Sequence, residues 1–138
     1  MKTTYIALVT GGYSSENIVS FKSAKTVHTA LNETYKNVFW VEVHPDKWFC
    51  KLNEETYPID KNDFSFLLDN NRIKFDYVFI AIHGTPGEDG KLQAYFDLLG
   101  IPYSSPNHIG STLTFNKWYC NTLLSQLDYK VATSQYLR

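Results

Sequence analysis

The chain has 138 residues, with 13 Lys and Arg against 14 Asp and Glu, and a formal net charge of −1. A hydrophobic fraction of 43% excludes an intrinsically disordered chain, and the near-neutral balance argues against a nucleic-acid partner, which needs a basic excess. No apolar run approaches the ~20 residues of a membrane span or starts the chain as a signal peptide would, so we expect one cytoplasmic domain with no membrane partner.

Strand-like and helix-like patterns alternate along the chain. Short apolar runs rich in β-branched and aromatic residues predict strands over 5–9, 37–43, 77–82 and 101–103, with a further strand beginning at 131. Apolar residues at spacings of three and four predict helices over about 18–31, 90–99, 107–113 and 116–127. This alternation implies an α/β fold: a three-layer, mostly parallel, Rossmann-like sheet with helices on both faces.

Turn and cap residues mark the ends of these elements. Ser14 and Ser15 are candidate caps of the first helix, and Asn116 is a candidate cap of the last. Gly100 fits the position just after the helix over 90–99, where a left-handed backbone is common.

The stretch from His44 to Arg72 is less regular than the rest. Residues 48–52 and 56–59 predict a hairpin across 53–55. Pro58 would confine the second strand to an edge of the sheet, because proline has no N–H for a ladder hydrogen bond.

The two cysteines, Cys50 and Cys120, lie too far apart to suggest a metal-ligand pair. Nothing indicates an oxidising compartment, so we expect two free thiols and no metal site in the chain. A catalytic cysteine would need a nearby histidine, which spacing alone leaves open.

Two loops follow the expected parallel strands, at the edge where such sheets bind ligands. In the first, over 10–16, the adjacent Gly11 and Gly12 permit close approach of a ligand, although a tight turn alone explains them. The third and sixth positions of the dinucleotide fingerprint lack glycine. Glu16 either compensates the helix dipole or aims its carboxylate at a ligand ammonium, and local sequence leaves both open.

The second loop, over 83–90, holds three glycines and a proline. His83 lies where a buried strand emerges and could donate to a substrate carboxylate or serve as a structural histidine. Glu88 and Asp89 invite a metal or acid–base role, but we prefer to read both as first-turn residues favoured by the helix dipole. Gln93 could hydrogen-bond the loop.

These segments together resemble a known family, the D-alanine-D-alanine ligases of the ATP-grasp superfamily. Residues 11–16, Gly-Gly-Tyr-Ser-Ser-Glu, followed by Val19 and Ser20, resemble its N-terminal motif. Residues 83–94 resemble its H-G-x-x-G-E-D-G-x-L-Q-G signature, and 101–103 and 116–117 match at the expected distance. Two departures are Ala94 for the usual Gly and Asn116 for the usual Asp. One methyl is readily absorbed, and both Asn and Asp cap helices.

The resemblance implies that residues 1–138 are the N-terminal, pre-ATP-grasp substrate-binding domain of a ligase that joins two D-alanines through an acyl phosphate for peptidoglycan synthesis. Glu16 would be catalytic and would bind the ammonium of the first D-alanine. Val19 would pack beside its methyl group, His83 would orient its carboxylate, and Lys117 would reach an ATP phosphate as a point charge.

The resemblance also implies partners outside the chain. ATP and Mg²⁺ or Mn²⁺ would be the cofactors, with the metal ligands in the central ATP-grasp and C-terminal domains, beyond these 138 residues. The whole enzyme would be a cytoplasmic homodimer. We expect the chain alone not to ligate D-alanine, and ATP-dependent phosphate release by it would contradict this.

Three alternatives stay open on the sequence. A D-alanine-D-lactate or D-alanine-D-serine ligase would share both motifs, because the choice of second substrate is made elsewhere. A non-catalytic domain could retain the fold, although it would be expected to lose Glu16 or Lys117. A nucleotide-binding Rossmann domain would carry the glycine fingerprint that is missing here.

Overall fold

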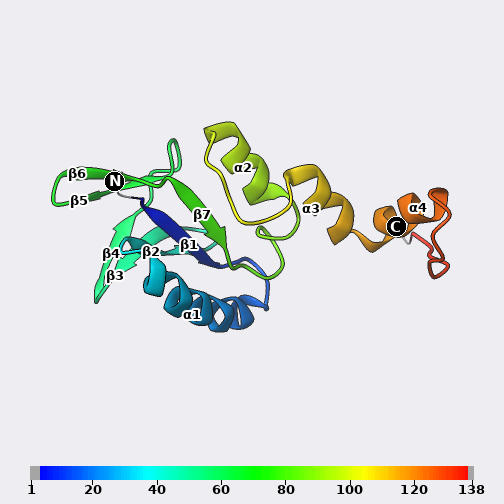
Figure 1. The fold of residues 1–138 in the computed structure, drawn as a ribbon, viewed down its shortest axis with the longest axis horizontal. Helices are drawn as coiled ribbons and strands as arrows, with labels where there is room; N and C mark the ends of the chain where they lie inside the picture. The colour runs from blue at the N-terminus through cyan, green and yellow to red at the C-terminus, as the bar shows by residue number, and fades with distance from the viewer. Residues whose placement is uncertain (1–3, 137–138) are drawn as a thin grey trace.

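A computed structural model describes residues 4–136, which form a five-stranded sheet in the order β4–β3–β2–β1–β7, flanked by helices (Figure 1). The strands of this sheet are β1 (Ile6–Gly11), β2 (Val38–Val43), β3 (Trp48–Leu52), β4 (Glu55–Pro58) and β7 (Tyr77–Ile80). A separate hairpin consists of β5 (Ser65–Leu68) and β6 (Asn71–Lys74). The helices are α1 (Asn17–Thr34), α2 (Lys91–Leu99), α3 (His108–Phe115) and α4 (Lys117–Gln126).

The sheet has a parallel half and an antiparallel half. β1 runs parallel to both neighbours, with Ile6 opposite Val38 of β2 and Tyr77 of β7. β3 and β4 continue the sheet antiparallel beyond β2. They are the hairpin expected from the sequence, and β4 with its Pro58 is the edge strand. The α/β prediction is confirmed, and this hairpin makes the sheet mixed.

The alternation of side chains along β1 divides the core into two layers. Ala7 and Val9 point to one face, where they join the larger apolar cluster with Leu92 and Phe96 of α2. Leu8 points to the opposite face, where it contacts the smaller cluster that includes Ala24 of α1. Helices therefore cover both faces of the sheet, as the sequence predicted.

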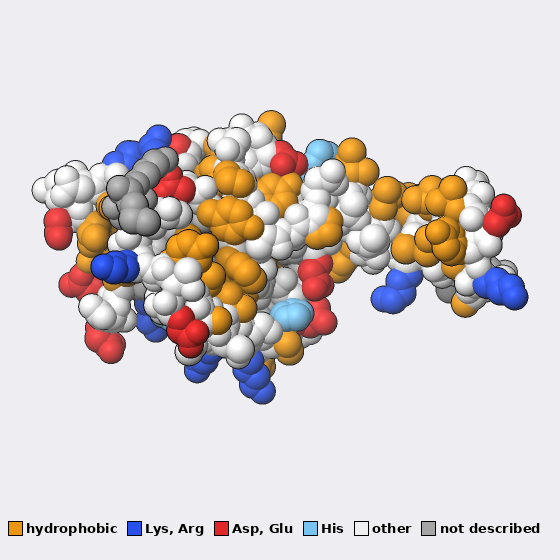
Figure 2. Space-filling model, in the orientation of Figure 1, with side chains coloured by type: hydrophobic (Ala, Val, Ile, Leu, Met, Phe, Trp, Pro, Cys, Tyr) orange, Lys and Arg blue, Asp and Glu red, His pale blue; other side chains and the backbone are white. Residues whose placement is uncertain are grey.

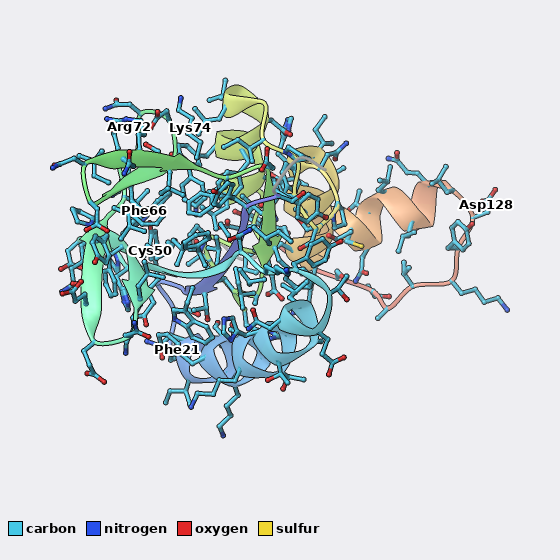
Figure 3. The ribbon with its side chains drawn as sticks, turned by 60° about the vertical axis from the view of Figure 1, so that its left-hand side comes forward. Phe21, Cys50, Phe66, Arg72, Lys74 and Asp128 are labelled. Atoms are coloured by element: carbon cyan, nitrogen blue, oxygen red, sulfur yellow. The ribbon has the colours of Figure 1, made fainter. Side chains whose placement is uncertain are left out.

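Aromatic rings fill the larger layer. Phe64 and Phe96 are fully buried, and their rings meet edge to face with centroids 4.8 Å apart. Phe66 and Cys50 belong to the same buried cluster, between the β5–β6 hairpin and the sheet (Figure 3). Burial raises the pKa of the Cys50 thiol to about 12, so this free thiol is a neutral core residue.

The β5–β6 hairpin was not predicted from the sequence. Its strands are short, and Phe66 anchors it in the core. On its outer side, Arg72 pairs with Asp60 at 3.1 Å and with Asp63 at 3.3 Å. Lys74 also pairs with Asp63, at 3.1 Å. Arg72 and Lys74 lie on the outer side of the hairpin, away from Phe66 (Figure 3).

Two predicted strands in the second half are wrong. Over 101–103 only one parallel bridge forms, between Val78 and Tyr103. Pro102 has no N–H to donate to β7. The next hydrogen bond along β7 goes to a side chain, since the Ile80 N–H donates to Ser104 Oγ at 3.0 Å. Residues 131–136 lack strand structure because α4 extends away from the sheet and leaves them no strand to pair with (Figure 1).

Helix ends follow the sequence prediction at two places out of three. Asn116 caps α4 by accepting backbone N–H groups, and Gly100 ends α2 with φ +67°. Asn107, which was not predicted as a cap, accepts the Gly110 N–H at the start of α3. The prediction for α1 is wrong. Glu16 holds the cap position without a side-chain cap bond, and Ser14 Oγ accepts the Glu16 N–H at 3.3 Å.

Two further findings concern the exposed parts of the chain. Of the ten residues of α4, all described, none is buried, and hydrophobic side chains gather over this end of the molecule (Figure 2). Within residues 4–136, the helices are too short or too polar to span a membrane.

Candidate functional site

The loops after β1 and β7 meet because these strands are parallel neighbours that end at the same edge of the sheet. The Tyr13 N–H donates to Thr85 O at 2.9 Å, and Ser14 Oγ donates to His83 O at 3.4 Å. The Glu16 side chain lies directly over Gly84: a Cβ built on Gly84 would come within 2.7 Å of Glu16 Oε2. The two loops therefore form one surface.

The loop over 83–90 is braced from inside. Gln93 is fully buried, and its Nε2 donates to Gly87 O at 2.6 Å and to Ser105 Oγ at 3.0 Å. This confirms the suggestion that Gln93 hydrogen-bonds the loop. At the other end, Glu88 Oε2 accepts the Gly84 N–H at 2.8 Å.

The sequence suggested that Glu88 and Asp89 lie in the first turn of a helix, and the structure shows that they do not. α2 begins at Lys91, so both carboxylates precede it and have loop partners instead. Asp89 accepts from Thr85 Oγ1 at 2.6 Å and pairs with Lys91. Glu88 and Asp89 therefore do not complement the dipole of α2. Their carboxylates accept hydrogen bonds from other residues of the loop over 83–90 and so close it.

A cleft of about 840 Å³ opens beside this surface. Glu16, His83 and Glu88 line it, and so does Lys117, at the start of α4. The fourth predicted site residue, Val19, is not among the residues that line the cleft. It lies one turn after Glu16 on α1, with 48% of its surface exposed.

Three residues in contact with His83 were not predicted to serve it. Ser20 Oγ accepts the His83 backbone N–H at 2.9 Å, and Ser23 Oγ lies 3.0 Å from His83 Nε2. Glu88 Oε1 lies 3.7 Å from Nδ1. The signal that could have found the serines is their spacing, since residues three apart share one face of a helix.

The charges on the cleft suit a small zwitterion and a phosphate. Glu16 is an exposed carboxylate, and Lys117 is an exposed ammonium. Within residues 4–136, no three His, Cys, Asp or Glu side chains gather into a metal-binding group. An exposed ammonium such as that of Lys117 can pair with a phosphate, whereas the described residues offer a divalent cation no ligand set.

Asp89 makes the loop sensitive to acid. Burial opposes ionisation of its carboxyl, but hydrogen bonds from Lys91 and Thr85 outweigh burial and hold its pKa below the ordinary 3.8. A depressed pKa contributes stability that is present above the ordinary value and is lost as the pH falls through the folded-state value. We expect Asp89→Asn to destabilise the chain at neutral pH and to flatten the loss of stability below about pH 4. Urea denaturation over a pH series measures this, with the exposed Asp46→Asn as control, and parallel curves for Asp89→Asn and the unmodified chain would contradict it.

Two features favour glycine at position 84: a left-handed backbone and the close approach of neighbouring side chains. Its φ is +73°, and a methyl group would collide with Glu16 Oε2 and Ser14 Oγ, both 2.7 Å away. Gly100 has a similar φ of +67° with no atom within 4 Å. We expect Gly100→Ala to cost about 1 kcal/mol for the left-handed backbone and Gly84→Ala to cost up to about 1 kcal/mol more, because the ends of the Glu16 and Ser14 side chains must turn away. Equal losses in chemical denaturation would refute the close contact.

Relatives of known name match nearly the whole chain. The family model described as D-ala D-ala ligase N-terminus matches residues 5–106. A D-alanine–D-alanine ligase of Porphyromonas gingivalis is 46% identical over 138 residues, covering 99% of this chain and 42% of the relative. One of Phocaeicola vulgatus is 48% identical over 139 residues, covering 100% and 43%. The chain thus spans less than half the length of these relatives.

Solved structures agree in fold. D-alanyl-alanine synthetase A of Vibrio cholerae superposes with a TM-score of 0.81 at 33% identity, covering 93% of this chain and 38% of that one. The VanG D-Ala:D-Ser ligase of Enterococcus faecalis gives 0.81 at 26% identity, covering 96% and 44%. With the family model matching from the first strand into the segment before α3, the chain belongs to the D-ala D-ala ligase N-terminus family.

Proposed function

We propose that residues 1–138 form the N-terminal substrate-binding domain of an ATP-dependent ligase that joins two D-alanines. The observation that carries the proposal is the convergence of Glu16, His83 and Lys117, from three separate segments, on one cleft. Relatives at 46% and 48% identity bear the name of this enzyme. The central ATP-grasp and C-terminal domains would belong to the rest of the protein.

The proposed reaction activates a poor leaving group. ATP phosphorylates the carboxylate of the first D-alanine, the amine of the second attacks the acyl phosphate, and phosphate leaves. Glu16 holds the ammonium of the first D-alanine by an ion pair, and His83 orients its carboxylate. Lys117 faces the phosphate and offsets negative charge that develops there.

Val19 takes a supporting part in this proposal. Its exposed side chain lies one turn beyond Glu16, on the same helix. A D-alanine whose ammonium is held by Glu16 would present its methyl group toward this turn. Val19 would then pack against the methyl group once the other domains cover it.

The proposal also assigns cofactors, partners and place. Mg²⁺ or Mn²⁺ would neutralise charge on the phosphates, held by ligands supplied from the other domains. The whole enzyme would act as a homodimer in the cytoplasm, where ATP is available. Sedimentation of the whole protein at several concentrations tests the dimer.

The test is product formation by the whole ligase. We expect D-alanine and ATP together to release phosphate and form D-alanyl-D-alanine, and D-alanine without ATP to form none. Absence of the dipeptide under both conditions would reject the ligase, and NAD binding by the chain would favour a dinucleotide domain instead.

The likeness to the VanG D-Ala:D-Ser ligase makes the second substrate a separate question. With D-alanine, D-serine and D-lactate offered together, we expect D-alanyl-D-alanine to dominate, since the relatives of higher identity carry that name. A majority of D-alanyl-D-serine or D-alanyl-D-lactate would identify the alternative ligase.

A further inference from the structure

The imidazole of His83 has a partner at each ring nitrogen. Nε2 lies 3.0 Å from Ser23 Oγ, and Nδ1 lies 3.7 Å from Glu88 Oε1. Ser23 is a half-buried residue of α1, and it does not line the cleft, whereas Glu88 does. The ring is thus held between the helix behind it and the cleft in front.

The chemistry of these partners decides which nitrogen carries the proton. An ionised carboxylate can only accept hydrogen bonds, while a hydroxyl can donate or accept. The proton of the neutral ring therefore belongs on Nδ1, on the side of Glu88. Nε2 is then an acceptor, and the Ser23 hydroxyl donates to it.

The same helix also fixes the backbone of His83. Ser20 Oγ accepts the His83 N–H at 2.9 Å and donates to Glu16 O at 3.3 Å. Ser20 is fully buried, so this link is shielded from water. Ser23 lies three residues after Ser20, on the same face of α1. This face therefore positions both the main chain of His83, through Ser20, and its ring, through Ser23.

We propose that Ser23 is a positioning residue that donates to Nε2 of His83 and, together with Glu88, keeps the ring in the Nδ1–H tautomer, which presents an N–H donor to the cleft. The donor serves a carboxylate of a small ligand, which under the proposed function is that of the first D-alanine. The identity of the ligand rests on the proposed function. The tautomer rests only on the contacts of the ring with Ser23 and Glu88.

The tautomer is read directly from imidazole nitrogen signals in NMR spectra of the 138-residue chain. It has four histidines, and His83→Gln assigns the signals of His83 by their loss. In spectra of the neutral ring, we expect a protonated Nδ1 and an unprotonated Nε2. Ser23→Ala should shift the ring toward the Nε2–H form, and Ser23→Thr, which keeps the hydroxyl, should not. An Nε2–H ring in the unmodified chain would overturn the proposal without any variant.

A second measurement uses the whole ligase. Loss of one hydrogen bond behind the ring should raise KM for the first D-alanine roughly three- to tenfold in Ser23→Ala. KM for ATP should stay unchanged, and Ser23→Thr should restore the D-alanine value. An unchanged KM for D-alanine in Ser23→Ala would overturn the positioning role.

The two measurements separate the possible failures. If the whole protein does not act on D-alanine, the proposed function fails, while the NMR result still decides the tautomer. If ligation occurs but the tautomer or the KM is insensitive to Ser23, the proposal for Ser23 fails alone.

Discussion

Replacing Glu16 with Gln in the whole ligase is expected to raise KM for the first D-alanine roughly 30- to 150-fold, because a hydrogen bond to a charged group contributes about 2–3 kcal/mol. The substitution keeps the size of the side chain and removes only the charge that would pair with the ammonium. Steady-state kinetics with D-alanine varied at saturating ATP measures the effect.

Two features of the chain sharpen this test. Glu33 is an exposed carboxylate on the same helix and lies far along it from the cleft, so Glu33→Gln is the matched control and should leave KM unchanged. Glu16 also packs over Gly84, so circular dichroism and urea denaturation should show that Glu16→Gln is folded. Kinetics equal to those of the unmodified ligase would remove Glu16 from the site.

The second large effect expected is on stability. Phe96 is fully buried on α2, and its ring contacts Phe64 edge to face. Truncating a buried phenylalanine to alanine costs about 3–5 kcal/mol, the lost burial plus a cavity. Since small domains have only about 5–15 kcal/mol of stability, we expect Phe96→Ala to lose a large part of the free energy of unfolding measured in urea.

Leu98 is the control on the same helix. Its side chain is 88% exposed, so Leu98→Ala removes a similar apolar group from water-exposed surface and should change stability by less than about 0.5 kcal/mol. A loss below about 1 kcal/mol for Phe96→Ala would contradict the buried aromatic layer between α2 and the sheet.

The β1 and β7 strands and all four helices were predictable because their signals are local. An apolar run such as residues 77–82 can only be a buried element, and Asn107 and Asn116 cap helices through bonds to N–H groups two or three residues away. The hairpin of β3 and β4 was predictable for the same reason, because Pro58 restricts its own strand. Such rules need no knowledge of what lies across the sheet.

The errors arise where distant residues decide. The β5–β6 hairpin pairs two strands of only four residues each and buries Phe66 against the distant core, which no local periodicity reveals. The segment over 101–103 makes one bridge because Ser104 Oγ replaces the next backbone partner of β7. Ser14 and Ser15 looked like caps, but Glu16 occupies the cap position.

The candidate site also has features that the sequence predicts and features that depend on contacts between distant residues. The sequence by itself determined the motifs in which Glu16, His83 and Lys117 stand, and the resemblance of these motifs to those of a known family predicts the roles of the three residues. Only the tertiary structure decided that they share one cleft, that Val19 does not line it, and that Ser23 and Glu88 hold the ring of His83. The physical reason is distance along the chain: the hydrogen bonds between α1 and His83 join residues 60 or more positions apart, and no local pattern records such a contact.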